Sequence, residues 1–123
     1  MGEQVEQFSP GSIRRLREGP AWIVVMDGDH DVSTAPALID ELERAFASDA
    51  PVVVDLVDVA FMDSAILNAL LAARERALAR CEGSFALVAP PGCFASRVLA
   101  LVVGTLISTY PDRTRALAAV AAG

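Results

Sequence analysis

The chain contains no lysine. All ten basic residues are arginine, against 16 acidic residues, and the formal net charge at pH 7 is −6. P-loop phosphate sites and Schiff-base chemistry both use lysine, so neither is available to this chain. An acidic domain with scattered arginines also lacks the basic surface that contacts to a phosphate backbone need. We therefore expect no direct binding of nucleic acid.

Histidine and cysteine are also scarce, which restricts nucleophilic and metal chemistry. The only histidine is His30, and the Gly-x-Ser-x-Gly turn of serine hydrolases is absent. Cys81 and Cys93 lack the spacing of metal ligands, so we expect reduced cysteines that are buried or half-buried. We expect no enzyme activity, no cofactor and no metal site.

No apolar run is long enough to cross a bilayer, although 54% of the residues are hydrophobic. The longest run, 98–107, is interrupted by Gly104 and Thr105 and falls short of the roughly 20 residues that a membrane-spanning helix needs. The N-terminus does not resemble a signal peptide, so we expect a cytoplasmic protein without a membrane span. The length of 123 residues suits one domain with one ordinary core.

Short apolar segments that alternate with amphipathic ones predict an α/β fold. Strands are expected at 12–17, 22–26, 52–56, 84–89 and 106–110, and helices from a cap at Ser33 or Thr34 through Phe46, at 64–80, at 94–103 and at 112–122. The helix that ends at Phe46 should pack one apolar face against the sheet, formed by Leu38, Ile39, Leu42, Ala45 and Phe46. The first two strands should form a hairpin, and 1–11 should be a flexible lead-in. Because parallel strands need helical crossovers, we predict one domain, 12–123, with a mixed β-sheet of four to five strands and helices packed against it.

The most informative segment is 52–67, where a strand runs into a helix. The strand is continuously apolar, as expected for a central parallel strand with both faces covered. The helix begins at Asp63-Ser64, so Ser64 lies at or next to its N-cap, where free N–H groups and the helix dipole favour an anion. The segment permits two interpretations: a phosphoryl group carried on Ser64, or Asp63 or Ser64 acting only as a helix cap.

Three carboxylates occupy alternate positions in Asp27-Gly28-Asp29-His30-Asp31. A calcium loop would need glycine and glutamate where this chain has Val32 and Leu38. An aspartyl phosphotransfer site would need a lysine further along the chain, and none exists. The segment is therefore predicted to be a solvated turn before the next helix, capped by Asp31 or Ser33.

These segments together resemble a STAS domain of the anti-sigma factor antagonist type, also called anti-anti-sigma factors. The resemblance covers nearly the whole chain, and the spacing between the matching blocks makes it specific. The matching residues are Gly28-Asp29-His30-Asp31, Val53-Val54-Asp55-Leu56, Phe61-Met62-Asp63-Ser64, Leu67, Leu71, Phe85-Ala86-Leu87-Val88, Pro91, Arg97-Val98-Leu99, Leu101 and Gly104.

The resemblance implies a bacterial transcription regulator. It implies that the unmodified domain binds an anti-sigma factor, often a serine kinase, and thereby frees a sigma factor, and that phosphorylation of Ser64 ends this binding. It further implies a monomer or weak homodimer whose partner-binding surface comprises Asp29, Asp31, Asp63, Ser64 and Ile66.

The chain departs from the family pattern directly after Ser64. The family usually has a small hydroxyl residue and then glycine, whereas this chain has Ala65 and Ile66. We expect Ile66 to fill the space that glycine leaves and to add a hydrophobic knob for a partner. The alternative is a STAS-like docking subunit that is not phosphorylated, for example on the ATPase of a lipid transporter or in a stress-signalling complex. A small phosphotransfer enzyme is a third possibility.

Overall fold

The computed structural model describes residues 11–80, 84–102 and 107–122 and has an α/β fold. The elements in chain order are β1 (Gly11–Glu18), β2 (Ala21–His30), α1 (Ala35–Ala47), β3 (Val52–Met62), α2 (Ser64–Arg80), β4 (Phe85–Val88), α3 (Phe94–Val102), β5 (Thr109–Tyr110) and α4 (Arg113–Ala122). The predicted class and the mixed sheet are confirmed. The lead-in 1–10, Cys81 and the predicted helix stop at Glu82-Gly83 lie outside the described residues, and Gly11 already belongs to β1.

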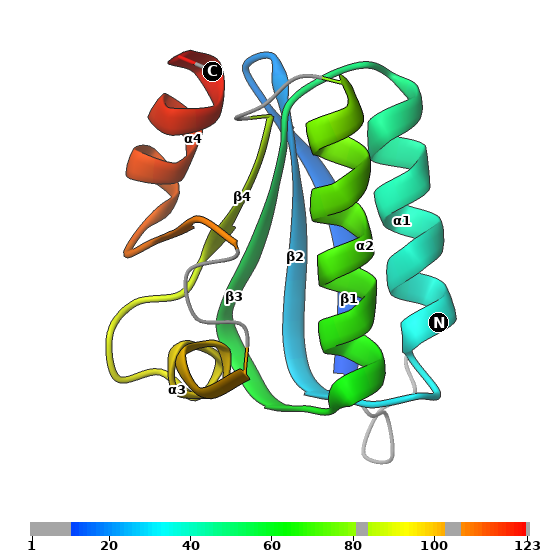
Figure 1. Cartoon of the computed structure of the whole chain (residues 1–123), viewed down its shortest axis with the longest axis vertical. Coiled ribbons are helices and arrows are strands. Elements are labelled where there is room, and N and C mark those ends of the chain that lie inside the picture. The colour runs from blue at the N-terminus through cyan, green and yellow to red at the C-terminus, as the bar shows by residue number, and fades with distance from the viewer. Residues whose placement is uncertain (1–10, 81–83, 103–106, 123) are drawn as a thin grey trace.

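The five strands form one sheet in the order β1-β2-β3-β4-β5 (Figure 1). β1 pairs with β2 in the antiparallel sense, and the remaining neighbours are parallel. A two-residue turn, Gly19-Pro20, joins the hairpin, and Gly19 has a φ of 58°, a conformation that glycine adopts at low cost. The predicted hairpin is therefore confirmed.

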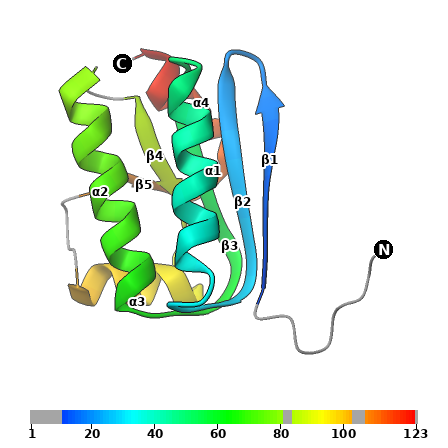
Figure 2. The ribbon, with the colours of Figure 1, turned by 90° about the vertical axis from the view of Figure 1, so that its right-hand side faces the viewer.

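Helices cover both faces of the sheet, which explains why β3 is continuously apolar. Val52, Val54 and Leu56 belong to the larger core cluster, which is completed by α1, α2 and α3. Val53 belongs to a second cluster that includes Ala116 and Val120 of α4. Figures 1 and 2 show α1 and α2 on one face and α4 on the other. Alternate residues of β3 thus enter different cores.

A charged pair anchors α4 to the sheet. Arg113 Nε donates to Asp55 Oδ2 at 2.6 Å, and the Asp55 side chain is only 9% exposed. The other carboxylate oxygen, Asp55 Oδ1, accepts a hydrogen bond from the Val57 N–H at 3.0 Å. Both oxygens of this buried acid therefore have partners, so its presence in an apolar strand carries no unpaired charge.

Most of the predicted apolar face of α1 is buried. Leu38, Leu42, Ala45 and Phe46 lie in the core, as the helical spacing indicates. The prediction is wrong for Ile39, which is 44% exposed. Ile39 faces small residues of α2 across a shallow groove, so no large side chain covers it.

The helices are short relative to a bilayer. No helix in the described parts of the chain combines the length and the apolar character needed to cross a membrane.

We predict that Val54→Asp lowers the free energy of unfolding by about 2–5 kcal/mol, because it places an unpaired charge in the core. Val54 is 0% exposed, whereas Val57 on the same strand is 39% exposed. Val57→Asp is therefore the matched control, with an expected loss of about 0.5 kcal/mol. Urea unfolding followed by circular dichroism measures both. Equal stability of the Val54→Asp variant and the wild type would refute the two-sided burial of β3.

We also predict that Arg113→Ala lowers the free energy of unfolding by roughly 2–3 kcal/mol, because Asp55 loses its counter-charge while staying buried. Arg115 is the matched control, since it pairs with Asp112 at 3.7 Å and its side chain is 70% exposed. Arg115→Ala should cost less than about 0.5 kcal/mol. If the two variants unfold at the same urea concentration, the Asp55–Arg113 pair does not anchor α4.

Candidate functional site

The predicted site residues gather at one edge of the sheet. β2 and β3 are parallel neighbours, with His30 opposite Met62 and Asp29 opposite Phe61. The chain leaves both strands at this edge, at the lower end of the molecule in Figure 1. Asp29 and Asp31 therefore lie on the same side of the domain as Asp63 and Ser64, as the carboxyl ends of parallel strands require.

Asp63 caps α2, and Ser64 is the first helical residue. Asp63 Oδ1 accepts hydrogen bonds from the Ala65 N–H at 3.0 Å and the Ile66 N–H at 3.4 Å. The carboxylate thus satisfies N–H groups that a helix start leaves without partners. Ser64 is exposed, so its hydroxyl lies on the surface beside the positive end of the helix dipole.

The structure corrects the interpretation of Ile66. Its side chain is 0% exposed and lies in the larger core cluster together with Leu67 and Leu70. The expectation of a hydrophobic knob for a partner is wrong, because the rotation of α2 about its axis turns position 66 toward the sheet. Ile66 acts on the site only by holding the first turn of α2 in place.

The turn after β2 is organised around Asp31. Asp31 Oδ1 accepts from the Ser33 backbone N–H at 2.8 Å and from the Ser33 hydroxyl at 2.6 Å. These hydrogen bonds favour the charged carboxylate and lower the pKa of Asp31 below its ordinary value. Thr34 occupies the predicted cap position of α1, but its side chain makes no cap hydrogen bond to the helix. Asp31 therefore remains a charged group at the surface to lower pH than an ordinary aspartate.

His30 is a buried structural residue. It is 0% exposed, Nε2 lies 3.0 Å from the Asp27 carbonyl oxygen, and Nδ1 lies 3.1 Å from Thr34 Oγ1. Because a carbonyl only accepts, Nε2 carries a proton and donates it to the Asp27 carbonyl oxygen. The Thr34 hydroxyl lies 3.1 Å from both His30 Nδ1 and the Asp31 carbonyl oxygen, so its single proton is shared between these two acceptor positions. A Cβ atom at Gly11 would lie 2.7 Å from Nε2, so the close passage of β1 requires glycine there. His30 offers no free nitrogen for proton transfer at the surface.

An exposed aromatic residue lies beside the site and was missed from the sequence. Phe61 is 45% exposed, and its ring centroid is 6.2 Å from that of Phe94 at the start of α3. The neighbouring Met62 is buried, so the alternation of β3 turns Phe61 away from the larger core. Val59 and Met62 both lie in the larger core, because the register between β2 and β3 skips Ala60, so simple alternation along β3 could not have placed Phe61 from the sequence.

The acidic residues of this edge do not form a metal site. No group of three or more His, Cys, Asp or Glu side chains in 11–80, 84–102 and 107–122 is arranged to hold a metal ion. Asp27 and Asp29 are exposed, but the prediction that they lie in a turn is wrong, because β2 continues to His30 and pairs there with β3.

Comparisons with known proteins agree with this geometry. The family model described as "Mlab, STAS domain" matches residues 14–108. No protein with a curated description matches the chain in sequence. The chain is similar to the crystal structure of an anti-sigma factor antagonist from Mycobacterium paratuberculosis, with a TM-score of 0.77, 26% identity, and coverage of 90% of this chain and 94% of that one.

Two further solved structures are similar in fold alone, because their sequences are less than a quarter identical. The NMR structure of the protein TM1081, from Thermotoga maritima, has a TM-score of 0.77 and 16% identity, covering 100% of this chain and 99% of that one. The anti-sigma factor antagonist SpoIIAA in its unphosphorylated form has a TM-score of 0.68 and 15% identity, covering 91% and 98%.

The family model spans well over half of the chain, and the element order agrees with the fold of these structures. STAS domains of the anti-sigma antagonist type are regulatory and not enzymatic. The chain belongs to the STAS domain family and has the SpoIIAA-like fold of anti-sigma factor antagonists.

Proposed function

We propose that the chain is an anti-sigma factor antagonist, which binds an anti-sigma factor and thereby frees a sigma factor in the bacterial cytoplasm. The observation that carries the proposal is an exposed Ser64 as the first residue of α2, beside the cap Asp63. The similarity to the antagonist from Mycobacterium paratuberculosis supports it. A serine at this position is accessible to a kinase without any opening of the core.

Phosphorylation of Ser64 by a serine kinase is the proposed switch. A phosphate adds about −1.5 to −2 charge and three acceptor oxygens. It would compete with Asp63 for the first N–H groups of α2 and would add negative charge to an edge that already carries Asp29 and Asp31. The modified edge should repel an acidic surface of the partner, while the core stays intact because Ser64 is exposed.

The proposed partner surface consists of Asp29, Asp31, Asp63 and Ser64, with Phe61 as its apolar member. Phe61 lies opposite Asp29 in the sheet register and precedes Ser64 by three residues. An exposed aromatic beside polar groups is typical of the central contact in protein interfaces. We infer that the domain uses this surface as a monomer or weak homodimer.

We further propose that the protein is not an enzyme and needs no cofactor. Catalysis by Ser64 would require a general base, and the only histidine is buried with both ring nitrogens in hydrogen bonds. Ser64 is therefore the acceptor of a phosphoryl group and not a nucleophile toward a substrate.

The second candidate function is a docking subunit that is never phosphorylated, for example on the ATPase of a lipid transporter. Ala65 and Ile66 favour it, because they replace the hydroxyl residue and glycine that usually follow the serine. The burial of Ile66 weakens this argument, since its side chain does not occupy the surface near Ser64.

We predict that a cognate anti-sigma kinase with ATP adds one phosphate to the wild type and none to Ser64→Ala. Intact-protein mass spectrometry measures this. Ser33→Ala is the matched control, because Ser33 is exposed near the same edge and should leave phosphorylation unchanged. In a pull-down, Ser64→Glu should bind the anti-sigma factor at least about tenfold more weakly than Ser64→Ala.

The alternative outcome is equally measurable. A wild type that binds its partner but is never modified would refute the switch and favour the docking subunit. Ile66→Gly does not discriminate between these functions, because it would empty a core position and cost about 2–5 kcal/mol of stability.

We also predict that the purified protein hydrolyses no phosphomonoester, carboxyl ester or nucleoside triphosphate above the rate in buffer. Chromogenic esters and phosphate release from ATP measure this. Asp29→Asn is the informative variant, because Asp29 is exposed and its removal should not unfold the domain. Turnover in the wild type that Asp29→Asn abolishes would show that the protein is an enzyme.

A further inference from the structure

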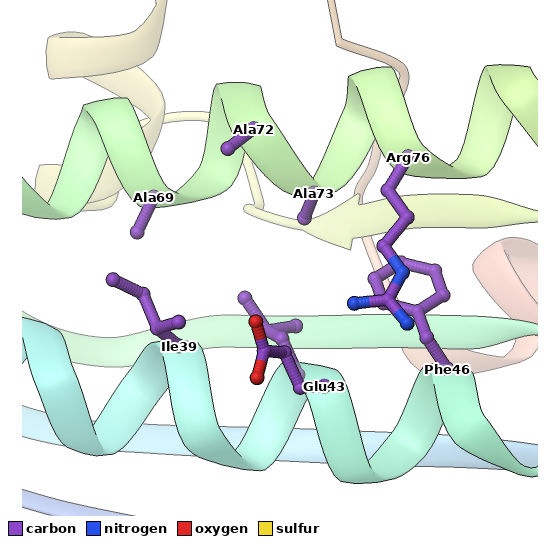
Figure 3. Close-up of a pocket in the computed structure, with 8 residues that line it drawn as sticks. Ile39, Glu43, Phe46, Ala69, Ala72, Ala73 and Arg76 are labelled. Carbon is purple, nitrogen blue, oxygen red and sulfur yellow. The ribbon is translucent and has the colours of Figure 1, made fainter.

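A groove runs between α1 and α2, on the side of these helices that faces away from the sheet. Its volume is about 80 Å³, and its floor is formed by buried side chains of both helices, namely Leu42 and Phe46 of α1 and Ala69 and Ala73 of α2. Figure 3 shows the groove. Both helices begin at the edge of the sheet that carries Ser64 and run side by side toward the opposite end (Figures 1 and 2). The groove therefore follows two parallel helices.

The groove is hollow because α2 presents alanine where α1 presents larger residues. Ala69 of α2 lies across from Ile39, which is 44% exposed, and Ala72 and Ala73 line the groove about one turn further along α2 (Figure 3). A Leu or Ile side chain on α2 would fill this space. The gap is large enough to admit one aliphatic side chain from outside.

Two opposite charges stand at the mouth of the groove. Glu43 is exposed on α1, and Arg76 of α2 holds its guanidinium 5.4 Å from the centre of the Phe46 ring. Neither has an ion-pair partner in the part of the chain that the structure describes. The nearby charges pair elsewhere, Arg44 with Asp40 at 3.0 Å and Arg74 with Glu75 at 3.7 Å.

The hollow and the two charged side chains follow one another along the groove, about one helical turn apart. Ile39, Glu43 and Phe46 occupy positions i, i+4 and i+7 of α1, so they form one row. Ala69, Ala73 and Arg76 occupy the same spacing on α2. Along the groove, an apolar hollow is therefore followed by an acidic and then a basic position, the pattern that a helix with complementary side chains would match turn by turn.

We propose that this groove docks an amphipathic helix of a partner protein. The helix inserts one aliphatic side chain, leucine or methionine, between Ile39 and Ala73. It places a basic residue against Glu43 and an acidic residue against Arg76. A second copy that docked through the same groove would not fill the hollow, because that groove is itself concave.

This surface is separate from the proposed switch, and the inference does not depend on the proposed function. Arg76 lies 12 residues after Ser64 on α2, a distance of about 18 Å along a helix that rises 1.5 Å per residue. A phosphate on Ser64 would therefore be largely screened from Arg76 at physiological salt, where the Debye length is about 8 Å.

The test uses designed helical peptides as probes. The first peptide is an alanine-rich helix that carries Leu, Lys and Glu one helical turn apart. It is made in two versions, in which these three residues follow one another in this order or in the reverse order along the chain. The matched control exchanges Lys and Glu and has the same composition. Fluorescence anisotropy gives the affinities, and amide chemical shifts of ¹⁵N-labelled protein locate the contact.

We expect the first peptide, in one of its two directions, to bind about tenfold more tightly than its exchanged control, because two complementary surface charge pairs become two repulsive ones. The shifted amides should include Ile39, Glu43 and Arg76. Ala72→Leu fills the hollow and should weaken binding at least tenfold. Ala100→Leu makes the same change at an exposed position of α3 and should leave binding unchanged. The double variant Glu43→Arg/Arg76→Glu should prefer the exchanged peptide, a gain of binding that unfolding cannot produce.

Several results would overturn the proposal. These are equal affinities for the two peptides in both directions, shifted amides outside α1 and α2, or no effect of Ala72→Leu. Amide shifts at the groove that depend on protein concentration without peptide would assign it to a second copy. Shifts caused only by phosphatidylglycerol vesicles would assign it to a lipid surface.

Discussion

The structure depends on the burial of β3 from both sides. Val52, Val54 and Leu56 lie in one core and Val53 in the other, so the strand is stable only when helices cover each face of the sheet. Three of the covering helices, α1, α2 and α3, are also crossovers between parallel strands, so the sheet is largely parallel. Parallel strands in turn bring the ends of β2 and β3 to one edge, where the site lies.

Two polar side chains inside this apolar frame, Asp55 and His30, are tolerated because each has hydrogen-bond partners. Asp55 is paired with Arg113 and with the Val57 N–H, and His30 is held between the Asp27 carbonyl and Thr34. Such groups would be costly if unpaired, so they restrict the position of α4 and of the turn after β2. The exposed edge with Ser64 rests on this rigid frame, which suits a switch that changes charge without changing fold.

Helix α2 contributes to two surfaces of different chemistry. Its first turn presents Ser64 beside acidic residues, and its middle presents alanines beside Ile39 and Arg76. One face of the same helix is buried against the sheet, so both surfaces are held in fixed orientation to the core. Under the two proposals, the domain contacts one partner at the sheet edge and another along the helices.

Much of the fold follows from local sequence patterns. The hairpin, the order of strands and helices and the start of α2 at Ser64 were all predicted, because apolar periodicity and capping residues are local signals. The clustering of Asp29 and Asp31 with Ser64 was expected only from the family resemblance, and the parallel register of β2 and β3 accounts for it.

Other features were decided only by tertiary packing. Ile66 is buried and Ile39 is exposed, the reverse of what was expected, because the rotation of each helix about its axis depends on its neighbours. Arg113 and Asp55 are separated by 58 residues, and no local pattern announces such a pair. The sequence by itself determined which segments are strands and helices and where Ser64 stands on α2. Only the tertiary structure decided which side chains reach the surface, since burial is a property of contacts between elements distant in the chain.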